Sequence, residues 1–233
     1  MTGIILPFLA NAQRKKAGDL AFLPVSNVVL DGHVQEWGGM LYNADSQLWN
    51  SGIALRGDSI YAAVVVKDPA LQREALMNGI VLNISYNSKK RDGARLYFPV
   101  ADREGLRALR QDEERQDEDY RQEVLNTTRG YYVLGFEKIV DGLLSFQNNY
   151  GVQAVVQLDT GSLSFEAVVP LALVGLKSDE FAVKIGVNTQ YSRMQANNRN
   201  QSRSLGPYGM APRSMPKNPY REPTELWIIG KRD

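Results

Sequence analysis

The stretch IVLNISYN, residues 80–87, determines the fold class, because apolar residues alternate along it with mostly polar ones. Every second position carries a large apolar side chain: Ile80, Leu82, Ile84 and Tyr86. A period of two residues places these side chains on one face of an extended chain, which is the pattern of a half-buried β-strand. The stretch therefore predicts a strand with one face in a hydrophobic core.

Further strands are expected along the rest of the chain. The same alternation recurs over residues 152–158, 163–169 and 181–188. The segment IYAAVVV, residues 60–66, is apolar on both faces, which is typical of a strand in the middle of a sheet. Strands so closely spaced, without regularly alternating helices, predict an all-β fold, a two-sheet antiparallel β-sandwich.

Turn residues separate these strands. Asp141-Gly142 and Asp159-Thr160-Gly161 are typical of hairpin turns, as is Arg56-Gly57-Asp58-Ser59. The last of these contains the integrin-recognition tripeptide Arg-Gly-Asp, which we interpret here as a turn because Gly-Asp directly precedes an expected strand.

Composition sets the broad class of the protein. At 233 residues, with 43% hydrophobic and 23% charged residues, the chain is an ordinary globular sequence with a sizeable core. A formal net charge of +1 gives no reason to expect nucleic acid as a partner. The absence of cysteine excludes disulfides, thiolate metal ligands and thiol nucleophiles. We expect a single domain over residues 13–233.

The N-terminal stretch MTGIILPFLANAQ indicates export. Its apolar run, Ile4 to Leu9, is too short to span a bilayer, and Ala10-Asn11-Ala12 has the small-x-small form of a signal-peptidase site. We interpret residues 1–12 as a signal-peptide remnant and expect a periplasmic or extracellular protein without a transmembrane span.

Two segments depart from the strand pattern. Residues 101–125 contain nine acidic and five basic residues and good helix formers, which predicts an exposed helical insertion. Residues 194–223 contain five basic residues and one acidic residue among many Pro, Asn, Gly and Ser, which predicts a long, flexible, basic loop without regular structure.

The only histidine lies in VVLDGHVQEWGGMLYN, residues 28–43. Asp31-Gly32 is expected to form a turn at the end of the first strand, with His33 at the turn and Trp37 plugging one end of the sandwich core. A single imidazole without cysteine or a second histidine is a poor metal or catalytic site, so we predict a structural role for His33.

Four blocks together resemble the family 9 carbohydrate-binding modules and their wider DOMON-like relatives. They are VVLDGHVQEWG (28–38), DSIYAAVVVKDP (58–69), GSLSFEAVVPLALVGL (161–176) and the closing strand TELWIIG (224–230). The resemblance implies a β-sandwich that recognises a ligand, with sugars bound by some members and haem by others. The helical insertion and the basic loop depart from the compact carbohydrate-binding form.

Sugar recognition needs aromatic rings for the apolar sugar faces and planar polar groups for the hydroxyls. The candidate ligand-binding residues are Tyr191 and Arg193, after the strand at 181–188, and Arg203 and Tyr208, in the basic loop. Solvated loop residues are the alternative interpretation of all four.

Cofactors are not predicted. Haem-binding relatives use axial His and Met ligands, and the methionines that could pair with His33 are Met77, Met194, Met210 and Met215. A turn and a flexible loop are poor platforms for axial ligation, so haem is only an alternative. Four acidic residues at strand ends could hold a structural calcium ion, namely Asp31, Glu36, Asp58 and Asp68. None follows an Asp-x-Asp-x-Asp loop with a closing Glu.

Enzyme signatures are missing from the sequence. We find no Gly-x-Ser-x-Gly elbow, phosphate loop, His-Glu-x-x-His or dinucleotide fingerprint. A pair of carboxylates such as Glu137 and Glu166 could flank a glycosidic bond, but the sequence does not give the distance between them. We therefore predict an exported, non-enzymatic recognition module for a glycan or another small polar ligand. Two alternatives stay open: a structural or partner-binding envelope protein, and a haem-binding redox module.

Overall fold

The computed structural model describes residues 20–39, 41–109, 118–201 and 217–232. The predicted signal-peptide remnant, residues 1–12, lies outside the described residues. Among the residues that are described, no helix is long and apolar enough to cross a membrane.

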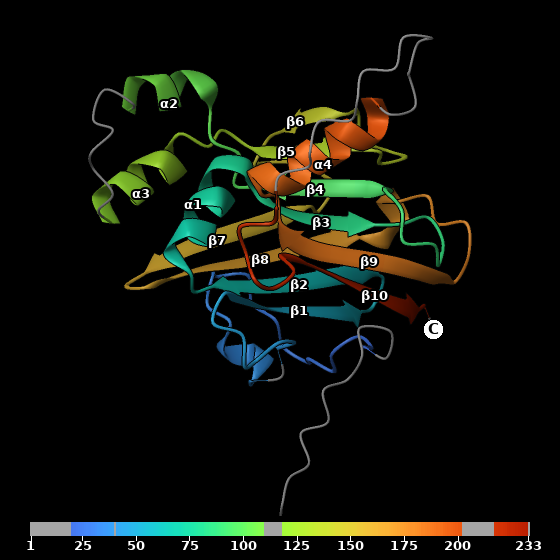
Figure 1. Cartoon of the computed structure of the whole chain (residues 1–233). Coiled ribbons are helices and arrows are strands. Elements are labelled where there is room, and N and C mark those ends of the chain that lie inside the picture. The colour runs from blue at the N-terminus through green and yellow to red at the C-terminus, as the bar shows by residue number, and fades with distance from the viewer. Residues whose placement is uncertain (1–19, 40, 110–117, 202–216, 233) are drawn as a thin grey trace, which may run out of the picture.

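Two antiparallel sheets pack face to face, as the strand pattern predicts (Figure 1). The four-stranded sheet has the order β1-β2-β8-β7. Its strands are β1 (Trp49–Arg56), β2 (Ser59–Val66), β7 (Gln153–Asp159) and β8 (Ser162–Pro170). The apolar segment at 60–66 is thus an interior strand, as expected.

The six-stranded sheet has the order β10-β9-β3-β4-β5-β6. Its strands are β3 (Ile80–Ile84), β4 (Ala94–Phe98), β5 (Tyr131–Leu134), β6 (Gly142–Leu144), β9 (Glu180–Val187) and β10 (Glu225–Lys231). Among the described residues there are also two short 3-10 helices, η1 (Gln35–Trp37) and η3 (Leu171–Leu173).

The core lies between the sheets and is formed by the inward side of each alternation. Its largest fully buried members include Phe165 and Leu163 from one sheet and Phe181, Leu82 and Leu96 from the other. In β3 the intervening Asn83 is also fully buried. Its Nδ2 donates to the Arg91 carbonyl (3.1 Å), and its Oδ1 accepts from the Gly93 N–H (2.8 Å). The side-chain amide of Asn83 is therefore paired, although both faces of this interior strand are buried.

The predicted turns join neighbouring strands. Arg56 pairs with Ser59 across a two-residue turn, and Asp159 pairs with Ser162 in the same way. Asp141 closes a longer connection between β5 and β6, in which its Oδ1 accepts a hydrogen bond from the Gly135 N–H (2.6 Å).

The segment before η1 differs from expectation, because residues 28–30 form no strand. Trp37 is fully buried, as predicted. It does not lie at an end of the sandwich, however, but packs against the outer face of the four-stranded sheet with Val25, Ala54 and Ala63. Small residues on that face make room for the indole, since a Cβ on Gly52 would lie 2.7 Å from the ring. The N-terminal segment is therefore a cover for this sheet.

Glu166 of β8 attaches this cover to the sheet. Its buried carboxylate accepts hydrogen bonds from Trp37 Nε1 (3.0 Å) and from the Gly32 N–H (3.1 Å). Gly32 has a φ of 85°, and a Cβ there would lie 2.8 Å from Gln157 Cβ, so the turn requires glycine. Burial raises the pKa of Glu166, against the opposing effect of its two N–H donors.

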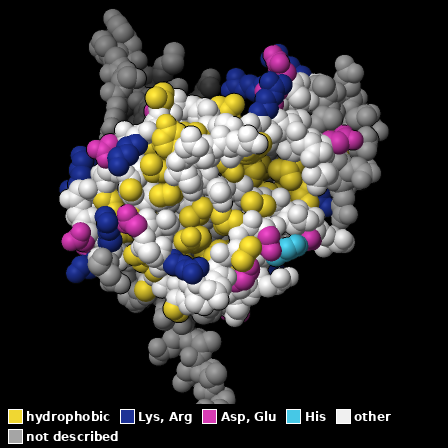
Figure 2. All heavy atoms as spheres, turned by 180° about the vertical axis from the view of Figure 1, so that it is seen from behind, with side chains coloured by type: hydrophobic (Ala, Val, Ile, Leu, Met, Phe, Trp, Pro, Cys, Tyr) yellow, Lys and Arg dark blue, Asp and Glu magenta, His cyan; other side chains and the backbone are white. Residues whose placement is uncertain are grey.

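His33 occupies the turn that the sequence predicts. Its backbone N–H donates to Asp31 Oδ1 (2.8 Å), and its side chain is exposed. As the only histidine, it is the single cyan side chain on the face shown in Figure 2.

The helical insertion is present, as helices α2 (Arg103–Leu109) and α3 (Glu118–Asn126). Residues 110–117 lie outside the described residues. The insertion is less exposed than predicted, because Leu106 and Val124 are buried in the main core. The apolar positions near its ends anchor the insertion to the sandwich.

Two more helices complete the fold, α1 (Pro69–Asn78) and α4 (Gln190–Gln201). Helix α4 corrects the loop prediction over residues 194–201. Its first turn is stabilised because Thr189 Oγ1 accepts from the Ser192 N–H (3.1 Å) and Glu74 Oε2 accepts from the Gln190 N–H (3.1 Å). Residues 202–216 of the predicted loop lie outside the described residues.

Trp37 and His33 should respond to truncation in opposite ways. Trp37→Ala is expected to reduce the free energy of unfolding by about 3 to 5 kcal/mol, because a fully buried indole leaves a cavity. His33→Ala, the control at the neighbouring turn, should change it by less than about 1 kcal/mol. Urea unfolding of both variants measures the difference, and a near-neutral Trp37→Ala would contradict the packing described here.

The stability contributed by Glu166 should depend on pH. Because its pKa is raised in the folded state, its contribution is fully present below the ordinary glutamate value of 4.5 and is lost as pH rises through the higher folded value. The stability advantage of the wild type over Glu166→Gln should therefore grow as pH falls from neutral toward 4.5. Urea unfolding across this range measures it, and an advantage that shrinks with falling pH would show that the two N–H donors outweigh burial.

Candidate ligand-binding groove

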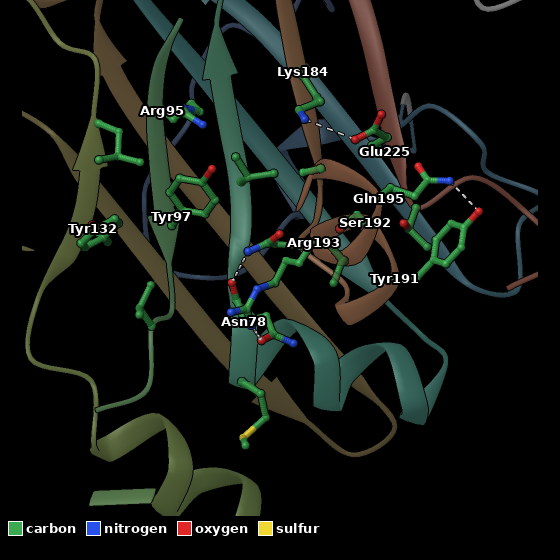
Figure 3. Close-up of a pocket in the computed structure, with 18 of the residues that line it drawn as sticks. Asn78, Arg95, Tyr97, Tyr132, Lys184, Tyr191, Ser192, Arg193, Gln195 and Glu225 are labelled. Carbon is green, nitrogen blue, oxygen red and sulfur yellow. Dashed lines mark hydrogen bonds and ion pairs between the residues drawn. The ribbon is translucent and has the colours of Figure 1, made fainter. Parts of the chain in front are cut away.

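The outer face of the six-stranded sheet forms the floor of a groove of about 2410 Å³ (Figure 3). Helices α4 and α2 stand on this side of the sheet and supply walls of the groove (Figure 1). Residues 218 and 221–225 line it as well, next to β10. The groove is therefore built from the six-stranded sheet and the segments that pack on its outer face, and no strand of the four-stranded sheet lines it.

Strand register arranges the floor in two rows that cross the sheet. One, which we call the cationic row, consists of Trp227, Lys184, Asn83, Arg95 and Leu134 on adjacent strands. The other, the aromatic row, consists of Glu225, Gly186, Val81, Tyr97, Tyr132 and Leu143. Both rows face away from the core because the residues between them, such as Leu82 and Leu96, face into it.

The cationic row holds two partly buried charges. The Lys184 ammonium lies 3.3 Å from Glu225 Oε2 and 5.5 Å from the centroid of the Trp227 ring, and its side chain is 17% exposed. The Arg95 guanidinium lies 3.2 Å from Asp92 Oδ2, with side chains 27% and 64% exposed. Among the described residues, Arg95 Nε is buried and has no hydrogen-bond partner. The carboxylate that pairs with Arg95 is thus an exposed one.

The aromatic row places two rings side by side. The Tyr97 and Tyr132 centroids are 6.3 Å apart at an interplanar angle of 62°, and Tyr132 is 40% exposed. Burial raises the pKa of Tyr97, with a smaller opposing effect of Arg95, so this ring is a neutral phenol that can donate a hydrogen bond. The floor therefore offers apolar ring surface directly beside a guanidinium.

Hydrogen bonds fix the α4 wall against the end of α1. Arg193 Nη1 donates to Asn78 Oδ1 (2.5 Å), and Asn78 Nδ2 donates to Glu74 Oε2 (2.6 Å). Gln195 Nε2 donates to the Tyr191 hydroxyl (2.6 Å) one turn away. Figure 3 shows Arg193 reaching toward Asn78 beside the floor. The charge of Arg193 is thus positioned by a neutral amide.

The groove is more basic than the whole protein. Nine basic and five acidic side chains line it, whereas the chain as a whole has a net charge of +1. Three of the acidic side chains pair with cations of the lining: Asp92 with Arg95, Glu225 with Lys184, and Asp102 with Arg129 (3.1 Å). An excess of positive charge in a recess attracts anions.

The structure brings two of the four predicted site residues together. Tyr191 and Arg193 line the groove from α4, while Arg203 and Tyr208 lie outside the described residues. The floor residues Arg95, Tyr97 and Tyr132 were missed. The alternation in ARLYF, residues 94–98, could have identified Arg95 and Tyr97, because these two residues occupy the outward positions of the strand.

The haem alternative finds no ligand pair among the described residues. His33 lies beside the outer face of the four-stranded sheet, whereas Met77 lines the groove on the opposite layer. Met194 is 45% exposed on α4, and Met210 and Met215 lie outside the described residues. His33 and Met77 therefore cannot ligate one iron.

Three of the four acidic residues considered for calcium have structural partners, whereas the buried Oε2 of Glu36 has no hydrogen-bond partner among the described residues. Asp31 bonds the His33 N–H, Asp58 pairs with Arg232 (3.2 Å), and Asp68 caps α1 through the Leu71 N–H (2.8 Å). No group of three or more His, Asp or Glu side chains within the described ranges could hold a metal ion. Glu137 lies beside Gly175, in a loop after β5, and Glu166 is enclosed under the cover, so these two carboxylates do not flank a common site.

The molecule is thus an antiparallel β-sandwich with one face closed and one face grooved. Comparison with models of known families, with curated proteins and with solved structures gives no match to this chain.

Asn78 should control the order of the α4 wall. Asn78→Ala removes the acceptor of Arg193, so backbone amides of residues 190–196 are expected to exchange with deuterium several-fold faster. Asn126→Ala, which changes the last residue of α3, is the matched control and should leave these amides unchanged. Equal exchange in both variants would show that Asn78 does not hold the helix.

Proposed function

We propose that the protein is an exported recognition module that binds an oligosaccharide in the groove. The observation that carries the proposal is the Tyr97–Tyr132 ring pair beside Arg95 on the floor of the six-stranded sheet. The short apolar N-terminal stretch and its small-x-small site support export. The four blocks that resemble family 9 carbohydrate-binding modules support a sugar as the ligand.

The chemistry of the floor matches that of a sugar. A pyranose ring has apolar C–H faces, which pack on aromatic rings, and equatorial hydroxyls, which need donors and acceptors in the same plane. Tyr97 and Tyr132 present ring surface, while Arg95, Lys184 and Glu225 of the neighbouring strands present donors and acceptors.

Recognition rather than hydrolysis is proposed because the carboxylates of the floor are already engaged. Glycoside hydrolysis requires two carboxyl groups free to act as acid and as base or nucleophile on either side of the bond. Asp92 and Glu225 each lie within 3.3 Å of a cation. Each of these two carboxylates is therefore already engaged in an ion pair.

A second candidate, binding of an envelope protein, is favoured by exposed apolar residues around β6. This β6 patch consists of Val140 (89% exposed), Leu143 (62%), Phe146 (44%) and Tyr150 (42%). Hydrophobic side chains also gather over the face shown in Figure 2. Exposed apolar surface of this kind is common at protein interfaces.

Truncation of the ring pair tests the sugar proposal. Tyr97→Ala and Tyr132→Ala should each weaken binding to a glycan identified on an array by roughly tenfold, since one ring contact of this kind contributes about 1 to 1.5 kcal/mol. Tyr150→Ala removes an equally exposed tyrosine outside the groove and is the matched control. Isothermal titration calorimetry measures the affinities.

The same variants separate the two candidates. Glycan binding that is lost with Tyr97 and Tyr132 but kept without Tyr150 supports the groove. Capture of an envelope protein that depends on Tyr150 and not on Tyr97, with no glycan bound on the array, would replace the sugar proposal with the protein-binding one.

A further inference from the structure

We infer that the ligand of the groove is an acidic glycan, whose carboxylate or sulfate groups are bound by Arg95 and Lys184. The inference rests on the proposed function and adds the chemical class of the sugar. Its basis is the position of the two cations on the floor, the way each is paired, and the charge of the surrounding walls.

The two cations lie where substituents of a sugar on the aromatic row would reach. Arg95 and Tyr97 are on the same face of β4, two residues apart, and Arg95 is therefore beside the ring surface. Lys184 is separated from Arg95 by β3 alone, a distance of roughly 10 Å for two strand spacings. An oligosaccharide that crosses the sheet along the aromatic row would pass both cations.

Arg95 is incompletely paired for a partly buried guanidinium. Its Nη1 contacts the carboxylate of Asp92, whose side chain is 64% exposed, and its Nε is buried without a partner among the described residues. A guanidinium binds a carboxylate or sulfate best through two parallel N–H donors. Reorientation toward a ligand anion would satisfy Nε and replace a weak surface ion pair by a bidentate one.

Lys184, like Arg95, is a partly buried cation that is paired with a more exposed carboxylate. Its ammonium is mostly buried over Trp227, whereas its partner Glu225 is 48% exposed, at 3.3 Å. In both ion pairs the cation is therefore more buried in the floor, and its carboxylate partner is more exposed to solvent. A ligand anion competes with Asp92 and Glu225 for cations that are already positioned.

The walls add to the attraction. Arg193 on α4 bonds only the neutral Asn78 among the described side chains, and the lining has nine basic side chains against five acidic ones. The field in the groove is therefore positive before a ligand binds, which favours an anion over a neutral sugar.

The test measures affinity of the full chain for three defined probes by calorimetry: hexagalacturonate, a chondroitin sulfate hexasaccharide and neutral xylohexaose. The acidic probes should bind at least tenfold more tightly than xylohexaose, and their affinity should fall from low salt to roughly 0.15 M. The two acidic probes distinguish a carboxylate from a carboxylate with sulfate.

Charge variants locate the effect. Arg95→Gln combined with Lys184→Gln should reduce affinity for the acidic probe by roughly tenfold or more. Arg56→Gln combined with Lys138→Gln removes the same charge from exposed positions outside the groove and should change it little. Asp92→Asn removes a competitor and should raise the affinity, a result that a purely structural role for Arg95 does not produce. Thermal melts confirm that each variant is folded.

The outcomes are distinguishable from those of the proposed function. Equal affinity for xylohexaose and the acidic probes, sensitive to Tyr97→Ala but not to the charge variants, would overturn this inference and leave sugar binding in place. Absence of binding to all three probes and to the glycan array would overturn both.

Discussion

The arrangement of the molecule depends on a buried carboxylate. Glu166 lies on the outer face of the four-stranded sheet and is fully buried there, a position that is costly for a charged group unless its oxygens are paired. The Trp37 indole and the Gly32 backbone supply the two donors, and both belong to the N-terminal cover. The same contacts that satisfy Glu166 therefore close one outer face of the sandwich. The groove lies on the outer face of the other sheet.

On the open sheet, strand register arranges the outward residues of the alternating strands into the floor of the groove. Antiparallel pairing aligns the outward residues of neighbouring strands, so that residues far apart in sequence such as Arg95, Lys184 and Tyr132 become neighbours on one floor. The helices then raise the sides of this floor. Their placement is set by core residues such as Leu106 and by the contacts of Glu74 with the start of α4. The result is a sheet face with raised walls, which forms the groove.

Local patterns predicted much of the fold and less of the site. The alternation at residues 80–87 and the turn at Arg56–Ser59 depend on neighbouring residues only, and both were predicted correctly. Helix α4 was missed over 194–201, because the residues that stabilise its start include Glu74, which is distant in sequence. Trp37 was predicted to be buried, but its partners, Ala54 and Ala63, are small residues on other strands that no local pattern identifies.

The sequence by itself determined the β-sandwich, the turn at His33 and the burial of Trp37, since hydrophobic period, turn chemistry and side-chain size act over a few residues. It also placed Tyr191 and Arg193 among the candidates for ligand contact. Only the tertiary structure decided which face is closed and which is open, and that Arg95, Tyr97, Tyr132 and Lys184 form one floor. The physical reason is that a strand's outward residues obtain their neighbours from register and sheet order, which are fixed by pairing between distant segments.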